Sequence, residues 1–153
     1  MHSFTISSNL PVTAEEILRT LTMAGVNSEL SPLVKMTAPR SWANRSILEW
    51  PEQQHLFDSW ILFLGMLPID RHSFYFDSIN PHEGFIEASS STTNSRWCHQ
   101  RRISPAQEGC RVSDIVEYQS RLPLLGYLLK PIYRLVFWCR HRNLRSKYGG
   151  YAS

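Results

Sequence analysis

The residues best suited to chemistry lie on two neighbouring stretches that alternate polar and apolar side chains and predict a β-hairpin. His99 and Arg101 lie on the first stretch, and Asp114 and Tyr118 lie on the second. A four-residue loop at 105–108 would place His99 directly opposite Asp114, with Arg101 diagonal to it. Because a slip of one residue would turn every side chain to the other face, this prediction depends on the assumed loop length.

The face that carries these groups is predicted to be the inner face of the sheet. It also carries the apolar side chains Trp97, Ile103, Val112 and Val116, and the same register pairs Trp97 with Val116 and Arg101 with Val112. A buried aspartate needs donors, which His99 and Arg101 can supply. Three interpretations stay open: a polar anchor for a ligand, a structural cluster that fixes the register, or a His99–Asp114 pair that transfers a proton.

Other candidate residues are spread along the chain. Trp60 and Leu62 alternate along a predicted strand and could form a cavity wall or ordinary core. Glu87 could face inward as an acid or outward into solvent. Tyr127 lies in the segment 126–131, whose Gly and Pro predict a mobile entrance to a cavity. The candidate ligand-binding residues are therefore Trp60, Leu62, Glu87, Trp97, His99, Arg101, Asp114, Tyr118 and Tyr127.

Several classes of function lack support in the sequence. The six histidines show no HxH or HExxH spacing and the three cysteines form no CxxC pair, so no metal site and no disulfide framework is predicted. No GxGxxG or GxxxxGK[ST] motif is present, so we expect no nucleotide cofactor. No catalytic residue is assigned and no nucleic-acid partner is expected. The cysteines are expected to be reduced in a cytoplasmic protein, and no signal peptide is recognised.

Charge is distributed unevenly along the chain. All 13 acidic residues lie at or before Glu117, while the seven basic residues Arg121, Lys130, Arg134, Arg140, Arg142, Arg145 and Lys147 follow it. The first part therefore has a net charge of −4 and the last part a net charge of +7. This pattern fits a solvated helix face that complements the helix dipole, or a surface for an anionic membrane or an acidic partner.

The order of the predicted elements indicates one domain over 1–153. A strand at 4–8 is followed by a helix that Thr13 and Glu16 would cap, running to about Met23, with Gly25 at its end and Asn27 capping a second short helix. An extended stretch at 33–37 comes next. Further strands are predicted at 56–66, 72–79, 84–93, 96–104 and 110–121.

A long helix closes the chain. It is predicted to begin between Leu122 and Pro131 and to end near Tyr148. Its apolar stripe contains Leu125, Leu128, Leu129, Ile132, Val136 and Cys139, of which Leu129, Ile132 and Val136 are expected to be buried against the sheet. The residues predicted opposite that stripe are Lys130, Arg134, His141 and Arg145.

This order resembles the helix-grip fold, and local stretches resemble the START-like superfamily of START domains, polyketide cyclases and the birch-pollen allergen (SRPBCC), in particular a bacterial branch of it. The stretches are Gly25–Pro32 (GVNSELSP), Met36–Arg40 (MTAPR), Leu67–His72 (LPIDRH), Trp97–Arg101 (WCHQR) and Arg140–Leu144 (RHRNL). The resemblance implies an α+β fold in which a curved antiparallel sheet of six or seven strands surrounds the long C-terminal helix, with two short helices after the first strand.

The resemblance also implies a central apolar cavity. The leading prediction is therefore the binding or carriage of a small hydrophobic or amphipathic molecule between sheet and helix. Two alternatives stay open. One is a cyclase, dehydratase or isomerase acting on a polyketide- or terpenoid-like substrate, and the other is an interaction protein that uses its basic C-terminal helix. The sequence leaves the oligomeric state undetermined.

Overall fold

The sheet of the computed structural model, which describes residues 1–153, is antiparallel throughout. Its strands are β1 (His2–Leu10), β2 (Val34–Met36), β3 (His55–Phe63), β4 (Leu67–Asn80), β5 (Gly84–Ser91), β6 (Asn94–Ala106), β7 (Gly109–Ser120) and β8 (Tyr151–Ala152). They pair in the order β2-β3-β4-β5-β6-β7-β1-β8. The sheet has eight strands rather than the predicted six or seven, because the short strands β2 and β8 extend its two edges.

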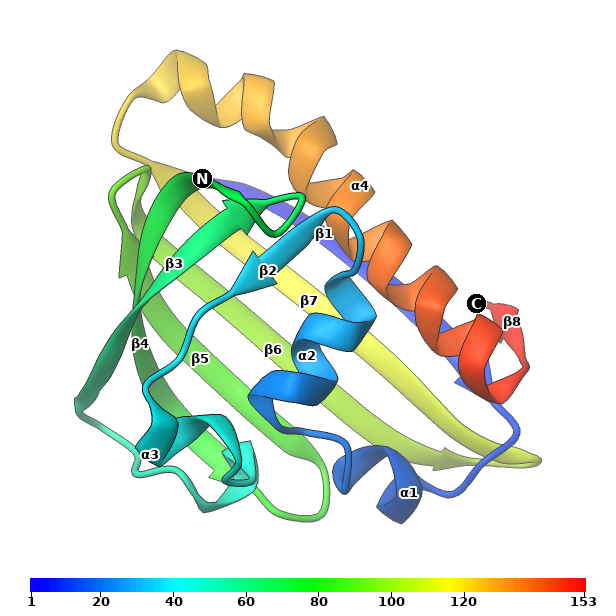
Figure 1. Cartoon of the computed structure of the whole chain (residues 1–153). Helices are drawn as coiled ribbons and strands as arrows, with labels where there is room; N and C mark the ends of the chain where they lie inside the picture. Colours follow the sequence, from blue (N-terminus) through cyan, green and yellow to red (C-terminus); the bar gives the residue numbers. More distant parts are fainter.

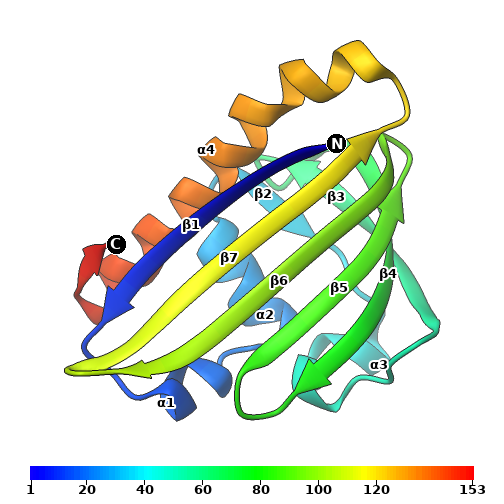
Figure 2. The same cartoon turned by 180° about the vertical axis from the view of Figure 1, so that it is seen from behind.

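The helices all lie on one side of this curved sheet (Figure 1). They are α1 (Ala14–Leu18), α2 (Met23–Leu30), α3 (Arg40–Ala43), the 3₁₀ helix η1 (Ile47–Glu49) and α4 (Pro123–Tyr148). Seen from behind, strands β4 to β7 and β1 form an outer face that no helix crosses (Figure 2). The predicted α+β architecture, with a long C-terminal helix held by an antiparallel sheet, is confirmed.

The two short helices begin with side-chain caps. The Thr13 hydroxyl accepts a hydrogen bond from the Glu16 amide at 3.3 Å, as predicted. The first helix ends earlier than predicted, because Thr22 caps the second helix and accepts from the Gly25 amide at 3.1 Å. Gly25 therefore lies in the first turn of α2 and not at the end of α1.

Asn27 fastens α2 to the edge of the sheet. It was predicted to cap the second helix but lies in its middle. Its amide donates to the carbonyl oxygen of Met36 at 2.9 Å and accepts from the Met36 amide at 2.8 Å. The short strand β2 is thus held in register by a helix side chain, which places α2 beside the sheet opening.

Helix α4 begins and ends within the predicted limits, but a different face is buried. Ile132 is 53% exposed, and Leu129 and Val136 are only half-buried. The residues of α4 that are buried in its second half are Phe137, Cys139, Arg140, His141 and Leu144. The prediction that His141 lies on the polar face is wrong, because its side chain is completely buried and hydrogen-bonded.

The core separates into two clusters. The larger one joins α1 and α2 to the sheet and includes an aromatic group under η1, where Trp50 contacts Phe57, Phe74 and Phe76. The smaller one lies beneath α4 and contains Phe4, Val116, Tyr118 and Phe137. The space between these clusters holds the polar groups and the cavity described below.

Candidate functional site

A cavity of about 230 Å³ lies between the sheet and α4. Most of the residues that line it are hydrophobic, and they come from α2, β2 to β6, η1 and α4. Four lining residues are roughly half-exposed, namely Phe63, Ile69, Ile132 and Leu135. The cavity therefore opens between the β3–β4 hairpin and the middle of α4. This apolar space lies where the cavity was predicted, and its volume is just below the usual range of about 300–1,000 Å³ for ligand sites.

The polar part of the cavity wall is a row of three side chains on neighbouring strands. His72 on β4 contacts Glu87 on β5, with 2.5 Å between Nε2 and Oε1. The other carboxylate oxygen of Glu87 lies 3.5 Å from Nδ1 of His99 on β6. Burial alone would raise the pKa of Glu87, but the two histidines outweigh it and lower that pKa to about 2. Glu87 thus faces inward and is ionised, which decides between the two predicted orientations.

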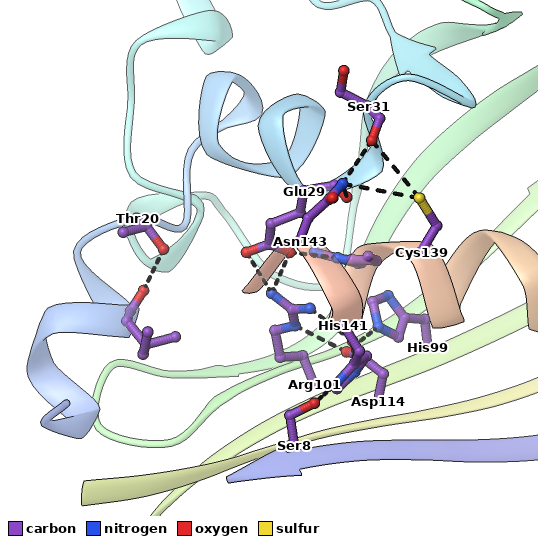
Figure 3. A network of polar contacts seen from close by, with 12 residues as sticks. Ser8, Thr20, Glu29, Ser31, His99, Arg101, Asp114, Cys139, His141 and Asn143 are labelled. Atoms are coloured by element: carbon purple, nitrogen blue, oxygen red, sulfur yellow. Dashed lines mark hydrogen bonds and ion pairs between the residues drawn. The ribbon is translucent and has the colours of Figure 1, made fainter. Parts of the chain in front are cut away.

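Asp114 is the centre of a buried polar network (Figure 3). Its Oδ1 accepts from His99 Nε2 at 2.8 Å and from Arg101 Nε at 2.9 Å. Its Oδ2 accepts from Arg101 Nη2 at 2.7 Å and contacts His141 Nε2 at 3.0 Å. Burial raises the pKa of this carboxyl, but the charges of Arg101 and Arg140 hold it well below its ordinary value. The predicted inward orientation of Asp114 and its pairing with His99 and Arg101 are confirmed.

The register behind that pairing differs from the prediction by two residues. The β6–β7 turn has two residues rather than four, so that Ala106 pairs with Gly109 and Arg101, not His99, lies opposite Asp114. His99 pairs with Val116 and Trp97 with Tyr118, in place of the predicted partners. Because side chains alternate with a period of two, a shift of two residues keeps every side chain on its predicted face.

Glu29 extends the network from the sheet to the helices. Its carboxylate accepts from Arg101 Nη1 at 2.8 and 3.0 Å and from Arg140 Nε at 2.5 Å. Burial opposes ionisation, yet the two guanidinium groups lower the pKa of Glu29. Through these contacts α2, β6 and α4 are joined by ion pairs that are almost completely buried.

A second arm of the network leads from Asp114 to the end of α4. His141 Nδ1 lies 2.8 Å from the Ser8 hydroxyl, which itself accepts from Arg145 Nη1 at 2.8 Å. The Ser8 hydroxyl therefore links His141 to Arg145, while Nε2 on the other side of the ring faces Asp114.

His99 lies between two of the three buried carboxylates. Glu29 contacts Arg101 and Arg140, Asp114 contacts Arg101, and Glu87 contacts His72 and His99. The two ring nitrogens of His99 lie 3.5 Å from Glu87 and 2.8 Å from Asp114.

The structure brings only part of the predicted site to the cavity. Glu87, Trp97 and His99 line it, whereas Arg101 and Asp114 lie behind the wall. Tyr118 is fully buried, and its hydroxyl donates to the carbonyl of Gly126 at 2.7 Å.

Trp60, Leu62 and Tyr127 do not line the cavity. Trp60 is 48% exposed and stacks under Arg71 on the other face of β3, so the predicted cavity-wall position of Trp60 and Leu62 is wrong. The inward residues of that strand are Ile61 and Phe63. Tyr127 is 70% exposed, and the centroid of its ring lies 4.6 Å from that of the His2 ring.

The cavity opening also differs from the prediction. Gly126 is buried, and a Cβ atom at that position would lie 2.7 Å from His2 Nε2, so this glycine allows close packing and does not border the entrance. The rim on α4 begins at Ile132, immediately after Pro131, and continues to Leu135.

The buried polar residues of the site that sequence reasoning missed include Glu29, His72, Arg140 and His141. For His72 a signal existed, since it alternates with Phe74 and Phe76 along one strand and all three face inward. For Arg140 and His141 the signal was their helical spacing from Phe137 and Leu144. Glu29 follows Val26 at helical spacing, but only the arginines explain its burial.

Other chemistries find little support among the groups present. The structure contains no cluster of three or more His, Cys, Asp or Glu side chains that could hold a metal ion. Cys98, Cys110 and Cys139 are free thiols, and burial raises the pKa of Cys98 and of Cys110. None of the helices has both the length and the apolar character needed to cross a bilayer.

Comparison with solved structures places the chain in a known architecture. Protein CV1439 from Chromobacterium violaceum superposes with a TM-score of 0.69 at 12% identity, covering 99% of this chain and 100% of that one. Ara h 8.0201 gives 0.58 at 12% identity, with coverages of 95% and 98%. DynU16, from the dynemicin biosynthetic locus, gives 0.60 at 11% identity, and the match covers 97% of this chain and 49% of DynU16. At these identities the likeness shows the fold alone, which is the expected helix-grip fold.

The sequence comparisons are more specific about family than about activity. The curated proteins contain no sequence that matches this one. One family model does match, over residues 8–148, which include α1 to α4, the whole cavity wall and every member of the buried network. The chain therefore belongs to the family described as "Domain of unknown function (DUF8410)".

Proposed function

We propose that this protein binds or carries a small hydrophobic or amphipathic molecule in the cavity between the sheet and α4. The observation that supports this most directly is the enclosed apolar space itself, since folded proteins normally fill their interiors. Burial of each ligand methylene would contribute about 0.8 kcal/mol, and the row His72–Glu87–His99 would orient a polar group. The likeness to Ara h 8.0201 and DynU16 supports this proposal at the level of the fold.

A neutral fluorescent probe tests the proposal. N-phenyl-1-naphthylamine should bind with increased emission, and Ile61→Trp should abolish binding because Ile61 lines the cavity. The matched control is Leu62→Trp, since Leu62 is the next residue of β3 and points away from the cavity. Equal binding by the two variants would show that the probe occupies another place.

Proton transfer inside the cavity is a second candidate, favoured by the presence of two histidines and an ionised carboxylate on its wall. In such a cyclase, dehydratase or isomerase, His72 or His99 would exchange a proton with the substrate while Glu87 orients the ring. Native mass spectrometry of protein purified from its own host distinguishes the two functions. Release of the bound molecule unchanged after incubation supports carriage. Conversion of that molecule to a product supports catalysis, provided that Glu87→Gln abolishes the conversion.

Peripheral contact with an anionic membrane is a proposal about how a ligand reaches the cavity. Exposed apolar residues surround the opening, among them Leu128, Ile132 and Leu135 on α4 and Met66 and Ile69 near the β3–β4 turn. Lys130 and Arg134 lie on the same part of α4. Co-sedimentation with phosphatidylglycerol vesicles, but not with phosphatidylcholine vesicles, is expected. It should weaken when Lys130 and Arg134 are changed to Glu. A cytoplasmic location and the absence of nucleic-acid binding stay predictions.

A further inference from the structure

The cavity contains two polar side chains that the protein itself leaves incompletely satisfied. Arg140 lines the cavity and is 3% exposed, and its Nη2 is buried without a hydrogen-bond partner. Asn94 also lines the cavity and is 2% exposed, and its Oδ1 is buried without a partner. Buried polar groups normally have partners, and leaving one unpaired destabilises the folded protein. Both residues line the same apolar space, so a ligand in that space is the candidate partner for these two groups.

The environment of Arg140 restricts what the ligand presents there. Its Nε already donates to Glu29 at 2.5 Å, and its guanidinium group lies over the ring of Phe137 at 5.7 Å. The positive charge is thus compensated, and what Nη2 lacks is a hydrogen-bond acceptor. A ligand carboxylate would add a negative charge beside Glu29, whose own carboxylate already contacts both Arg101 and Arg140. Adding an unbalanced charge to such a dry region is costly. A neutral carbonyl oxygen supplies the acceptor without that cost.

The environment of Asn94 favours a ligand group that can both donate and accept a hydrogen bond. One end of its amide, Nδ2, donates a hydrogen bond to the Tyr133 hydroxyl at 2.7 Å. The other end, Oδ1, is left without a partner in the protein, and the two ends of an amide can be exchanged by a flip. A hydroxyl group can serve either orientation.

The helix sets the distance between the two polar positions. Tyr133, beside Asn94, and Arg140 lie on the same face of α4 and are separated by about two turns, or about 10 Å along the helix axis. The wall between them is apolar and includes Val136 and Phe137. On the basis of the proposed ligand-binding function, we propose that the ligand is a neutral molecule with an apolar body, a carbonyl oxygen bound by Arg140 and a hydroxyl bound by Asn94.

Matched compounds of similar size test this inference on the unaltered protein. Displacement of N-phenyl-1-naphthylamine should require about tenfold less nonan-2-one than octanoate at pH 8, because only the ketone supplies an uncharged acceptor. A terminal hydroxyl, as in 9-hydroxynonan-2-one, should improve displacement further, and Asn94→Leu should remove that improvement. If octanoate displaces the probe as well as the ketone does, the inference is wrong although the proposed function stands.

Variants of α4 provide the second measurement. Arg140→Met should weaken nonan-2-one binding about tenfold while Glu29 keeps its contacts with Arg101. Arg142→Met is the matched control, since Arg142 is exposed on the same helix. Unchanged ketone binding by a folded Arg140→Met protein would overturn the inference. Should that variant fail to fold, the comparison of ketone and carboxylate on the unaltered protein decides alone. A protein that binds no probe at all would overturn the proposed function and this inference together.

Discussion

Asp114 illustrates how a residue can be central to a site without contacting its ligand. Four hydrogen bonds occupy its two carboxylate oxygens, and the side chain has no exposed surface. It therefore has no free lone pair to offer to a bound molecule. Its role is to hold His99 and Arg101 in place, and His99 in turn reaches the cavity. Among the three interpretations of the cluster, this geometry favours a structural one for Asp114, while Glu87 and His99 are the members that line the cavity.

Asp114→Asn is expected to lower stability and leave ligand affinity unchanged. The substitution removes a charge while Arg101 stays buried, which typically costs about 3–5 kcal/mol. Urea unfolding should show this loss, whereas probe affinity measured on the folded fraction should change less than twofold. Glu117→Gln, on the outer face of the same strand, is the control and should be nearly neutral. A large loss of affinity in folded Asp114→Asn would instead make Asp114 a ligand anchor.

Side-chain alternation explains which residues of the site could be predicted. Inward orientation of His99, Arg101 and Asp114 follows from the period of two along a strand and survives an error of two residues in register. The same reasoning failed for Trp60 and Leu62, because both faces of β3 carry large apolar side chains. Hydrophobicity alone cannot tell which face of such a strand meets the cavity.

Helix α4 shows the limit of apolar periodicity at the scale of an element. Its most apolar stripe, which includes Leu128 and Ile132, is largely exposed, and the face with Arg140 and His141 is buried. The reason is that Glu29 and Asp114 lie on the opposing surfaces and need donors. Helical spacing from Phe137 and Leu144 marks this face, but the ion pairs that bury it join residues far apart in the sequence and cannot be read from one sequence.

The buried face of α4 is tested by two alanine substitutions. Phe137→Ala should cost about 3–5 kcal/mol, because Phe137 packs against Phe4, Trp97 and His99 in the smaller core cluster. Leu128→Ala removes a side chain that is 68% exposed and should cost less than about 0.5 kcal/mol. Unfolding free energies from urea titration compare the two, and equal losses would place the predicted stripe against the sheet after all.

The first half of α4 is expected to be the more mobile half. Pro131 lacks an amide hydrogen, which removes one helix hydrogen bond, and few side chains before Tyr133 are buried. Amide exchange should be faster for residues 124–133 than for 136–145, and bound probe should slow it near Ile132 and Leu135 because they line the cavity. Uniformly slow exchange along the helix would contradict this.

At the scale of the whole molecule, the buried network joins the sheet to two helices in addition to the apolar core. It connects β1, β4 to β7, α2 and α4 through side chains that are almost completely buried. The fold class could be predicted because the order of strands and helices and the local resemblance suffice for it. The position of the cavity opening could not, because it depends on how α4 packs across elements that are distant in the sequence.

Because the network depends on ionised carboxylates, acid should unfold the protein. The pKa of Glu87 is lowered from 4.5 to about 2, and those of Glu29 and Asp114 are also lowered. A lowered pKa contributes stability that is complete above the unfolded-state value and is lost as the pH falls toward the folded-state value. For Glu87 this contribution is about 3 kcal/mol, and it should disappear between pH 5 and about pH 2.

Urea unfolding at several pH values between 7 and 2.5 measures this loss. The free energy of unfolding should decrease steeply below about pH 4.5, and Glu87→Gln should unfold more readily at pH 7 while losing less stability on acidification. Glu83→Gln provides the control, since Glu83 is an exposed residue of the turn before β5 and its removal should leave the acid dependence unchanged. If Glu87→Gln shows the same decrease as the unaltered protein, His72 and His99 do not hold Glu87 in its ionised form. The polar row on the cavity wall would then lack the charge assigned to it.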